Sequence, residues 1–242
     1  MHVRFLAPGA RLDQLAALPA EEAEHLVRVL RLRAGAEVTV FDGRGHEYLA
    51  VVESVGHTGV SVRPIARREA APEPSVHLTV ALGITKGDRM DAAVRDAAML
   101  GASIVQPVAT SRSEATLAAL ARGKRVERWR RIAISSVKQC GRAVVPEVRD
   151  ALALSDYLAR ESADLRLLLL EPRAEGSPTL AGASKPQSAA LLIGPEGGWT
   201  ADEIKAACRA GFHTMTLGQR TLRADAVPVA AISVLQFIWG DL

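Results

Sequence analysis

Two glycine-bearing turns, each preceded by an apolar stretch, lie close together near the C-terminal end of the chain. The first is Ala189-Ala190-Leu191-Leu192-Ile193-Gly194-Pro195-Glu196-Gly197-Gly198-Trp199, and the second is Met215-Thr216-Leu217-Gly218-Gln219-Arg220-Thr221-Leu222-Arg223-Ala224-Asp225. In α/β folds, ligands bind where strands end in such turns, because the turns present backbone donors and acceptors at the edge of the sheet. Neither turn has the Lys-Ser/Thr pair of a P-loop or the G-x-G-x-x-G spacing of a dinucleotide site. The pair therefore predicts an α/β domain whose ligand is held by backbone and apolar groups.

A pocket of this kind suits a neutral or cationic adenosine compound, and S-adenosylmethionine is one. Further motifs support this interpretation: Phe41-Asp42-Gly43, Lys86-Gly87-Asp88-Arg89-Met90, Leu100-Gly101 and Gln139-Cys140-Gly141-Arg142. Together with the turns at 193–198 and 217–223, and in this order, they resemble the RsmE-type 16S rRNA uridine-N3 methyltransferases of the SPOUT superfamily. The resemblance covers nearly the whole chain. Where that family usually continues Leu-Arg-Thr-Glu-Thr-Ala, this chain has Leu222-Arg223-Ala224-Asp225-Ala226-Val227, so the acid is shorter and the threonine hydroxyls are missing.

The composition agrees with an ordered enzyme that handles nucleic acid. The chain has 242 residues, of which 48% are hydrophobic, enough for one large or two modest packed domains. A formal net charge of +3 and a pI of about 9.1 are a mild indication of an anionic partner. Two cysteines, Cys140 and Cys208, and a start without an apolar signal segment predict the cytoplasm. The apolar run 226–239 is shorter than the roughly 20 residues that span a membrane, so we expect a buried helix and no membrane partner.

The chain divides near residue 70. Residues 1–68 contain short strand-like stretches separated by Gly and Asp turns, which predict a small barrel or sandwich, with one helix from Glu21 to Leu30. Residues 69–74 have the composition of a linker. From residue 75 to 242, strands and helices alternate as in a mainly parallel α/β sheet. The resemblance implies a PUA-like RNA-binding β-barrel for residues 1–68 and a SPOUT methyltransferase domain with a trefoil knot for residues 75–242, in a homodimer.

Local signals give the elements of the second domain. We expect strands at 76–84, 104–108, 165–170, 189–193 and 214–217, and a helix at 88–100 closed by Gly101. Thr200 and Glu203 form a capping-box pattern that begins another helix. Asp225 is a candidate N-cap for the last helix, with Pro228 in its first turn. That helix is apolar nearly all round, so we expect it to be buried against the sheet, a second subunit, or both.

A basic helix in the middle of the chain points to RNA. If residues 124–139 are helical, Lys124, Arg128, Arg131 and Lys138 fall within an arc of about 80°. Val126, Trp129, Ala133 and Val137 then form an opposing apolar side. Phosphate contacts require such a basic stripe, although a solvated surface face is the alternative. The candidate RNA contacts of the whole chain are Arg4, Arg28, Arg31, Lys86, Arg89, Arg112, Lys124, Arg128, Arg131, Lys138 and Arg142; for Arg4 and Arg28 a solubilising role is equally open.

The resemblance implies where the cofactor binds. It points to Leu170, Glu171, Pro172, Ile193, Gly194, Pro195, Glu196, Gly197, Gly198, Leu217, Gly218, Gln219, Leu222 and Arg223. The glycines could instead only permit turns, and Glu196 could only complement a helix dipole. The six histidines and two cysteines show no metal spacing, so we expect no metal and no covalent nucleophile.

Methyl transfer to uridine N3 demands positioning, loss of the N3 proton and stabilisation of charge on O2 and O4. An arginine is the natural stabiliser, and Arg223 is our candidate, although it could pair structurally with Asp225 or Glu171. Glu196 and Asp225 are candidates for a base or for orienting groups. The expected partner is 16S rRNA or the small ribosomal subunit, and not DNA. A SPOUT-like enzyme with another RNA target, such as a ribose 2′-oxygen, and a non-catalytic RNA-binding module are the alternatives.

Overall fold

The computed structural model describes residues 3–57, 59–172 and 184–242, and the chain forms two compact units. Unit 1 contains the chain up to Glu73 together with Val137–Val145, and unit 2 contains Pro74–Ser136 and Pro146–Leu242. The first boundary falls inside the stretch 69–74, which has the composition of a linker. The return of residues 137–145 to unit 1 has no counterpart in the sequence pattern, because long-range contacts and not local composition determine it.

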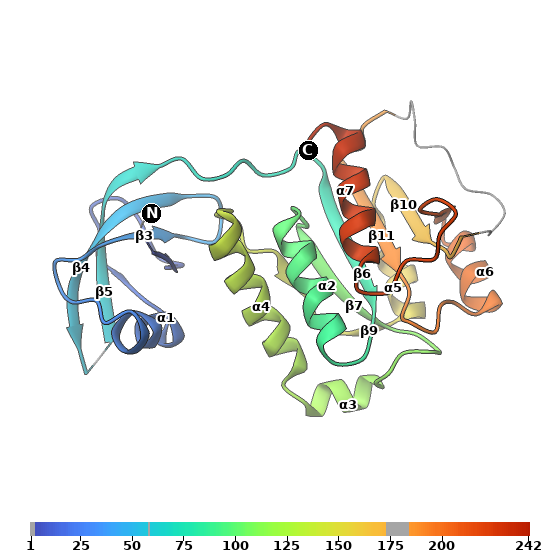
Figure 1. The fold of residues 1–242 in the computed structure, drawn as a ribbon, viewed down its shortest axis with the longest axis horizontal. Coiled ribbons are helices and arrows are strands. Elements are labelled where there is room, and N and C mark those ends of the chain that lie inside the picture. Colours follow the sequence, from blue (N-terminus) through green and yellow to red (C-terminus); the bar gives the residue numbers. More distant parts are fainter. Residues whose placement is uncertain (1–2, 58, 173–183) are drawn as a thin grey trace. The chain divides into compact units, whose positions relative to one another are not determined.

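Unit 1 is built on one five-stranded sheet (Figure 1). Its strands are β1 (Arg4–Leu6), β2 (Ala16–Ala17), β3 (Glu37–Phe41), β4 (Glu47–Gly56) and β5 (Gly59–Arg68), in the order β1-β3-β4-β5-β2. The β1–β3 pairing is parallel and the others are antiparallel. Register shifts in the long β4–β5 pair mark irregularities that help the sheet to curl. Alternate apolar residues of these strands pack into one core, with Phe5 and Val62 fully buried.

The helix expected at 21–30 is two elements. An α-helix, α1 (Ala20–Glu24), runs directly into one π-helical turn, η1 (His25–Val29), and Arg31 then adopts a positive φ of 53°. The N–H of Leu30 donates to the carbonyl of His25, five residues earlier. Leu26 is completely buried within this wider turn. The departure from α-helical spacing therefore coincides with the packing of Leu26 into the core.

The sheet of unit 2 is parallel in every pairing between its described strands. Its order is β12-β10-β11-β6-β7-β8, with β9 paired to β7. The strands are β6 (His77–Gly83), β7 (Ile104–Ala109), β8 (Glu147–Val148), β9 (Leu152–Ala153), β10 (Leu165–Leu169), β11 (Ser188–Ile193) and β12 (His213–Met215). The chain moves outward from β6 through β7 to β8 and then crosses to β10 on the other side. The carboxyl ends of β10, β11 and β12 therefore lie together at one edge, confirming the mainly parallel α/β architecture.

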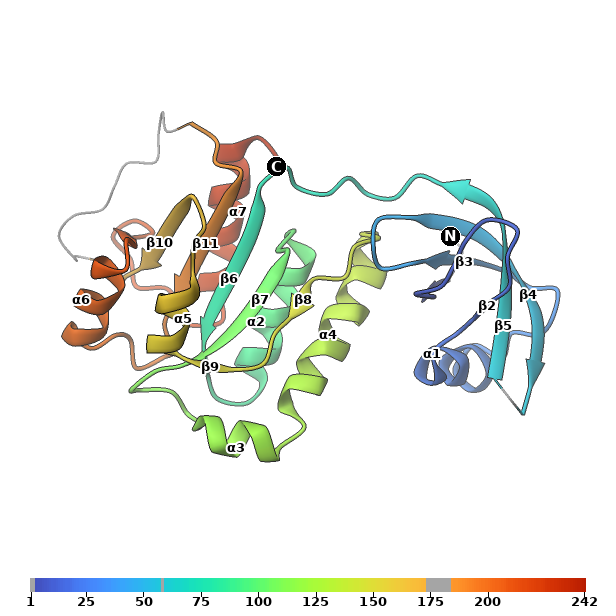
Figure 2. The ribbon, with the colours of Figure 1, turned by 180° about the vertical axis from the view of Figure 1, so that it is seen from behind.

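Helices cover both faces of this sheet (Figures 1 and 2). The helices α2 (Asp88–Met99) and α7 (Val227–Trp239) contact each other on one face, whereas α5 (Leu154–Arg160) and α6 (Ala201–Arg209) lie on the other. The apolar core on the second face includes Tyr157 and Leu158 of α5 and Phe212. The remaining helices are α3 (Leu117–Arg122) and α4 (Arg125–Cys140), and the last residues of α4, from Val137, belong to unit 1.

Several local predictions are confirmed and two are wrong. Thr200 and Glu203 form the capping box of α6, and Gly101 has a φ of 90° just after α2. The predicted strand 214–217 is shorter and ends at Met215. The N-cap of α7 is Ala226 and not Asp225, because the carboxylate of Asp225 lies 3.3 Å from Arg223 instead of bonding to the helix.

Candidate active site

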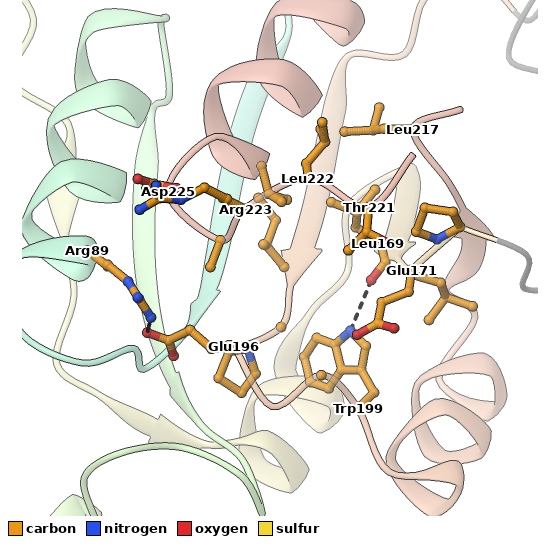
Figure 3. A pocket seen from close by; sticks show the side chains of 18 of the residues that line it. Arg89, Leu169, Glu171, Glu196, Trp199, Leu217, Thr221, Leu222, Arg223 and Asp225 are labelled. Carbon is orange, nitrogen blue, oxygen red and sulfur yellow. Dashed lines mark hydrogen bonds and ion pairs between the residues drawn. The ribbon is translucent and has the colours of Figure 1, made fainter. Parts of the chain in front are cut away.

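A cavity of about 280 Å³ opens at the carboxyl ends of β10, β11 and β12 in unit 2 (Figure 3). Three segments form most of its wall: residues 169–172 after β10, residues 193–199 after β11, and residues 217–227 after β12. The backbone N–H of Leu170 donates to the carbonyl of Met215, which ties the first segment to the end of β12, where the third segment begins. The two glycine-bearing turns thus meet at one site.

Most of the predicted cofactor residues line this cavity. They are Leu170, Glu171, Pro172, Ile193, Gly194, Pro195, Glu196, Gly198, Leu217, Leu222 and Arg223. Among the described residues, the predicted Gly197, Gly218 and Gln219 are not part of the wall. The structure adds Arg89, Leu169, Trp199, Arg220, Thr221, Ala224, Asp225 and Val227. Arg89, from α2, was predicted to contact RNA, and Asp225 was a catalytic candidate. The others lie close in sequence to predicted cofactor residues, which was the available signal.

The turn after β11 is shaped by one aromatic ring. The indole N–H of Trp199 donates to the carbonyl of Leu169 at 3.0 Å, so the ring joins the ends of β10 and β11 (Figure 3). A Cβ atom on Gly194 would lie 2.9 Å from this ring, which is too close. Gly198 has a φ of 67°, a conformation that glycine adopts without strain. Glycine is required at 194 for packing and at 198 for backbone shape.

A second close approach involves Gly83, at the end of β6. A Cβ atom there would lie 2.6 Å from both the nitrogen and the Cδ of Pro195. The backbone of β6 can therefore touch the turn after β11 only because residue 83 has no side chain. Gly83 was not among the predicted site residues, since its role depends on a partner more than a hundred positions later in the chain.

Glu196 lies in a polar network at the cavity wall. Its Oε1 atom accepts a hydrogen bond from the guanidinium of Arg89 at 2.9 Å (Figure 3). It also accepts one from the backbone N–H of Lys86 at 3.2 Å. Burial acts to raise the pKa of Glu196, but its own backbone N–H, Arg89 and Lys86 donate to the carboxylate and together hold the pKa below its ordinary value. Glu196 is therefore a fixed anion at neutral pH, joining the start of α2 to the turn after β11.

Arg223 is an exposed cation of the wall, with 80% of its side chain accessible. Its Nε lies 3.3 Å from Oδ1 of Asp225, and both side chains are at the cavity (Figure 3). The structural alternative considered for Arg223, an ion pair with Asp225, is thus present. This pair leaves most of the guanidinium facing solvent, where it can meet an incoming anion.

Arg112 belongs to the same region, although it was predicted to contact RNA. Its Nη1 donates to the carbonyl of Gly197 at 2.6 Å, and the carbonyl of Trp199 lies 3.4 Å away. The structure therefore places Arg112 against the turn after β11.

Three predicted RNA contacts in unit 1 are engaged inside the protein. The guanidinium of Arg4, only 10% exposed, donates to Glu47 and to four backbone carbonyls of residues 137–142. Lys138 is bonded to Glu22 at 2.8 Å, and Arg142, 5% exposed, is paired with Glu73. The prediction that these side chains contact RNA is not supported, because their donors are committed to internal acceptors.

The other predicted RNA contacts are at the surface. Arg28 is exposed and pairs with Glu24, four residues earlier, and Arg31 is exposed. Lys86 is exposed at the start of α2. These side chains can exchange their present surroundings for a phosphate at little cost.

The basic stripe of α4 is confirmed in part. Lys124, Arg128 and Arg131 are exposed, and Arg128 forms an ion pair with Asp91 of α2. Lys138 lies farther along the helix and is only 20% exposed. The opposing apolar side is buried as predicted: Val126, Trp129, Ala133 and Val137.

Two negative findings concern the described part of the chain. Residues 3–57, 59–172 and 184–242 contain no group of three or more His, Cys, Asp or Glu side chains that could hold a metal ion. No helix within these ranges has the length and apolar character needed to cross a membrane.

Comparisons with known proteins agree with this geometry. Residues 72–236 match an RNA methyltransferase domain, and residues 18–65 match the PUA domain of RNA methyltransferases. The Ribosomal RNA small subunit methyltransferase E of Synechocystis is 31% identical over 94% of this chain and 75% of its own length. The corresponding protein of Mycobacterium bovis is 30% identical over 93% of this chain and 88% of its own length.

Two solved structures share nearly the whole fold. The Ribosomal RNA small subunit methyltransferase E of Neisseria gonorrhoeae, bound to S-adenosylmethionine, is 30% identical with a TM-score of 0.88, covering 99% of this chain and 98% of that one. A methyltransferase of Legionella pneumophila, also with S-adenosylmethionine, is 32% identical with a TM-score of 0.89, covering 98% of both chains. The domain match, the identity and the shared fold lead to one conclusion: this chain belongs to the family of ribosomal RNA small subunit methyltransferase E.

Proposed function

We propose that this protein transfers a methyl group from S-adenosylmethionine to N3 of a uridine in the 16S rRNA of the small ribosomal subunit. The observation that carries the proposal is the cavity at the carboxyl ends of β10, β11 and β12, walled by the two glycine-bearing turns. Relatives that are named as small-subunit rRNA methyltransferases, one of them solved with S-adenosylmethionine, support it.

The residues of the cavity fit this cofactor. The cavity has a volume of about 280 Å³, close to the lower end of the range for small-molecule sites. Five side chains give it an apolar surface: Leu169, Leu170, Ile193, Leu217 and Leu222. Three carboxylates also line it: Glu171, Glu196 and Asp225. Three arginines line it as well, Arg89, Arg220 and Arg223, so the wall carries both signs of charge and offers carboxylates to a positively charged sulfur.

The cofactor supplies the reactive methyl group, carried on a positively charged sulfur. The chain must orient the uracil, accept the N3 proton and stabilise the negative charge that develops on O2 and O4. We assign charge stabilisation to Arg223, because its guanidinium is at the cavity, exposed, and tethered by Asp225. A cation already held near the reacting atoms needs little rearrangement during the reaction.

The two candidate acids differ in their surroundings. Glu196 is bonded to Arg89 and to the backbone of Lys86, and its lowered pKa makes it a weak proton acceptor. We therefore assign Glu196 an orienting role at the cavity wall. Asp225 lines the cavity beside Arg223, and we assign it as the candidate base, acting directly or through water.

For RNA binding, we propose that the N-terminal domain, residues 1–68, grips the rRNA while residues 75–242 carry out the chemistry. The match of residues 18–65 to a PUA domain of RNA methyltransferases supports this division. Arg28, Arg31, Lys86 and the stripe of Lys124, Arg128 and Arg131 are the proposed phosphate contacts, since all are exposed. A ribosomal substrate is consistent with a cytoplasmic enzyme.

We also propose the trefoil knot and the homodimer implied by the resemblance to SPOUT enzymes. The dimer is supported by the outer face of α7, where Val229, Val234, Phe237 and Ile238 are exposed, Phe237 to 72%. Sedimentation analysis should give twice the mass of one chain. A monomer at micromolar concentration would contradict the dimer without affecting the proposed chemistry.

The decisive experiment measures the transfer of labelled methyl from S-adenosylmethionine to 16S rRNA, offered free and within small subunits that lack the modification. Digestion and nucleoside analysis then identify the product. We expect N3-methyluridine at a single site, and the preferred substrate shows when in ribosome assembly the enzyme acts. A 2′-O-methylated product would show that the enzyme acts on a ribose oxygen and not on uridine N3. Failure to bind the cofactor would favour a non-catalytic RNA-binding module.

A further inference from the structure

The turn that follows β7 is held rigidly against α6. Within it, the backbone N–H of Thr110 donates to Oγ of Ser113 at 2.9 Å. The backbone N–H of Ser111 donates to Oε1 of Glu203 at 2.8 Å, and Glu203 also closes the capping box with Thr200. One carboxylate therefore joins this turn to the start of α6. The backbone of the residue between Ser111 and Ser113 is held in place by these hydrogen bonds.

That residue is Arg112. Its guanidinium donates to the carbonyl of Gly197 at 2.6 Å. A Cβ atom on Gly197 would lie 3.0 Å from the Cβ and 3.2 Å from the Cδ of Arg112, so the arginine stem lies directly on the glycine. Gly197 has no positive φ to explain its identity. The close approach of Arg112 supplies the reason for glycine at this position.

Arg112 and Gly197 are not among the residues that line the cavity, but the neighbours of Gly197 are. Glu196 precedes it, and Gly198 and Trp199 follow it. Trp199 is also fixed to the carbonyl of Leu169. A side chain that holds residue 197 from outside the wall therefore controls where the wall residues on both sides of it lie.

We propose that Arg112 is a positioning residue for the cofactor site, which acts through the turn at 196–199, and not a contact to RNA phosphate. This inference rests on the proposed function, because it assumes that the cavity binds S-adenosylmethionine. A turn fixed in advance does not have to be ordered when the ligand arrives, so the ligand binds more tightly.

The test compares cofactor affinity by isothermal titration calorimetry for the wild-type protein and the Arg112→Ala variant. We expect binding of S-adenosylmethionine to weaken about tenfold, which corresponds to about 1.4 kcal/mol. In methyl transfer, KM for the cofactor should rise in parallel while kcat stays nearly constant, because Arg112 does not line the cavity. The salt dependence of rRNA binding should be unchanged.

Arg130→Ala is a matched control. Arg130 is also an exposed arginine of unit 2 that donates to a backbone carbonyl, that of Val148, and to a carboxylate, that of Asp150. It is not part of the cavity wall, so its loss should leave cofactor affinity at the wild-type value. An equal loss of affinity in both variants would indicate general destabilisation and overturn the inference.

Two further variants keep the inference testable if Arg112→Ala folds poorly. Arg112→Lys retains one donor and should recover part of the affinity. Gly197→Ala places a methyl group 3.0 Å from Arg112 and should weaken binding although Arg112 is still present. If the wild type binds the cofactor and both Arg112→Ala and Gly197→Ala bind equally well, the inference is wrong and the proposed function stands; if the wild type binds none, the proposed function fails as well.

Discussion

Arg4 in unit 1 and Arg223 in unit 2 are the same residue type in opposite surroundings. The side chain of Arg4 is 10% exposed and its donors are bonded to Glu47 and to the carbonyls at the end of α4. The side chain of Arg223 is 80% exposed and has one carboxylate neighbour. An arginine with its donors satisfied holds the fold together, whereas one with donors to spare can meet a substrate. This difference predicts that substitution of Arg4 will lower the stability of the fold, whereas substitution of Arg223 will lower the rate of methyl transfer.

The largest effect is expected for Arg4→Ala. The change leaves Glu47, which is 9% exposed, without its cation and removes one donor from each of four backbone carbonyls, so we expect the free energy of unfolding to fall by about 3 kcal/mol or more. Urea unfolding followed by circular dichroism measures this. Cofactor affinity, a property of unit 2, should change little. Arg28→Ala, which removes an exposed pair with Glu24, is the control and should cost no more than about 0.5 kcal/mol.

Arg223→Ala should give the reverse pattern. We expect kcat for methyl transfer to fall roughly 100-fold, about 2.7 kcal/mol, because the variant lacks the cation that stabilises the developing charge. Unfolding should be unaffected, since the side chain is mostly in solvent. Single-turnover kinetics with saturating cofactor separate chemistry from binding. Wild-type turnover in this variant would remove Arg223 from the mechanism.

Gly83→Ala should combine both kinds of effect. The new methyl group would lie 2.6 Å from the backbone nitrogen of Pro195, so either β6 or the turn after β11 must move. We expect a loss of stability of about 1–3 kcal/mol together with weaker cofactor binding. Thermal unfolding and calorimetry measure the two. Gly9→Ala is a suitable control, because a Cβ atom at Gly9 would meet nothing within 4 Å.

The smallest effect concerns pH and the pair of Arg89 and Glu196. The pKa of Glu196 is lowered from its ordinary value of 4.5, so the folded state favours the carboxylate. The resulting stability is present above pH 4.5 and is lost as the pH falls through the lower folded value. Because the pair is partly exposed, we expect less than about 1 kcal/mol. The difference in unfolding free energy between wild type and Glu196→Gln should therefore be present at neutral pH and vanish in acid; a constant difference would contradict the assignment.

Signals contained in a few neighbouring residues predicted the fold well. Thr200 and Glu203 form the capping box because cap and N3 residue are close in sequence. The apolar side of α4 follows from helical periodicity alone, and Val126 and Trp129 are buried accordingly. Most of the cofactor residues also line one cavity, since the ends of parallel strands meet at one edge of a sheet.

What the sequence could not supply depends on distant partners. Lys138 was predicted as part of the basic stripe and Arg142 as a separate RNA contact, but in the fold they pair with Glu22 and Glu73. Glycine is needed at position 83 because Pro195 leaves no room for a side chain. Asp225 forms an ion pair with Arg223 instead of capping α7. In each case the partner, and not the local pattern, fixes the role.

The return of residues 137–145 to unit 1 bears on the order in which a newly made chain can fold. A nascent chain ending at Glu73 contains Arg4 and Glu47 but none of the carbonyls of residues 137–142 that Arg4 binds. Lys138, which pairs with Glu22, and Arg142, which pairs with Glu73, have also not yet been synthesised at that point. The unit that comes first in the sequence is therefore completed only after residue 145 of 242 has left the ribosome.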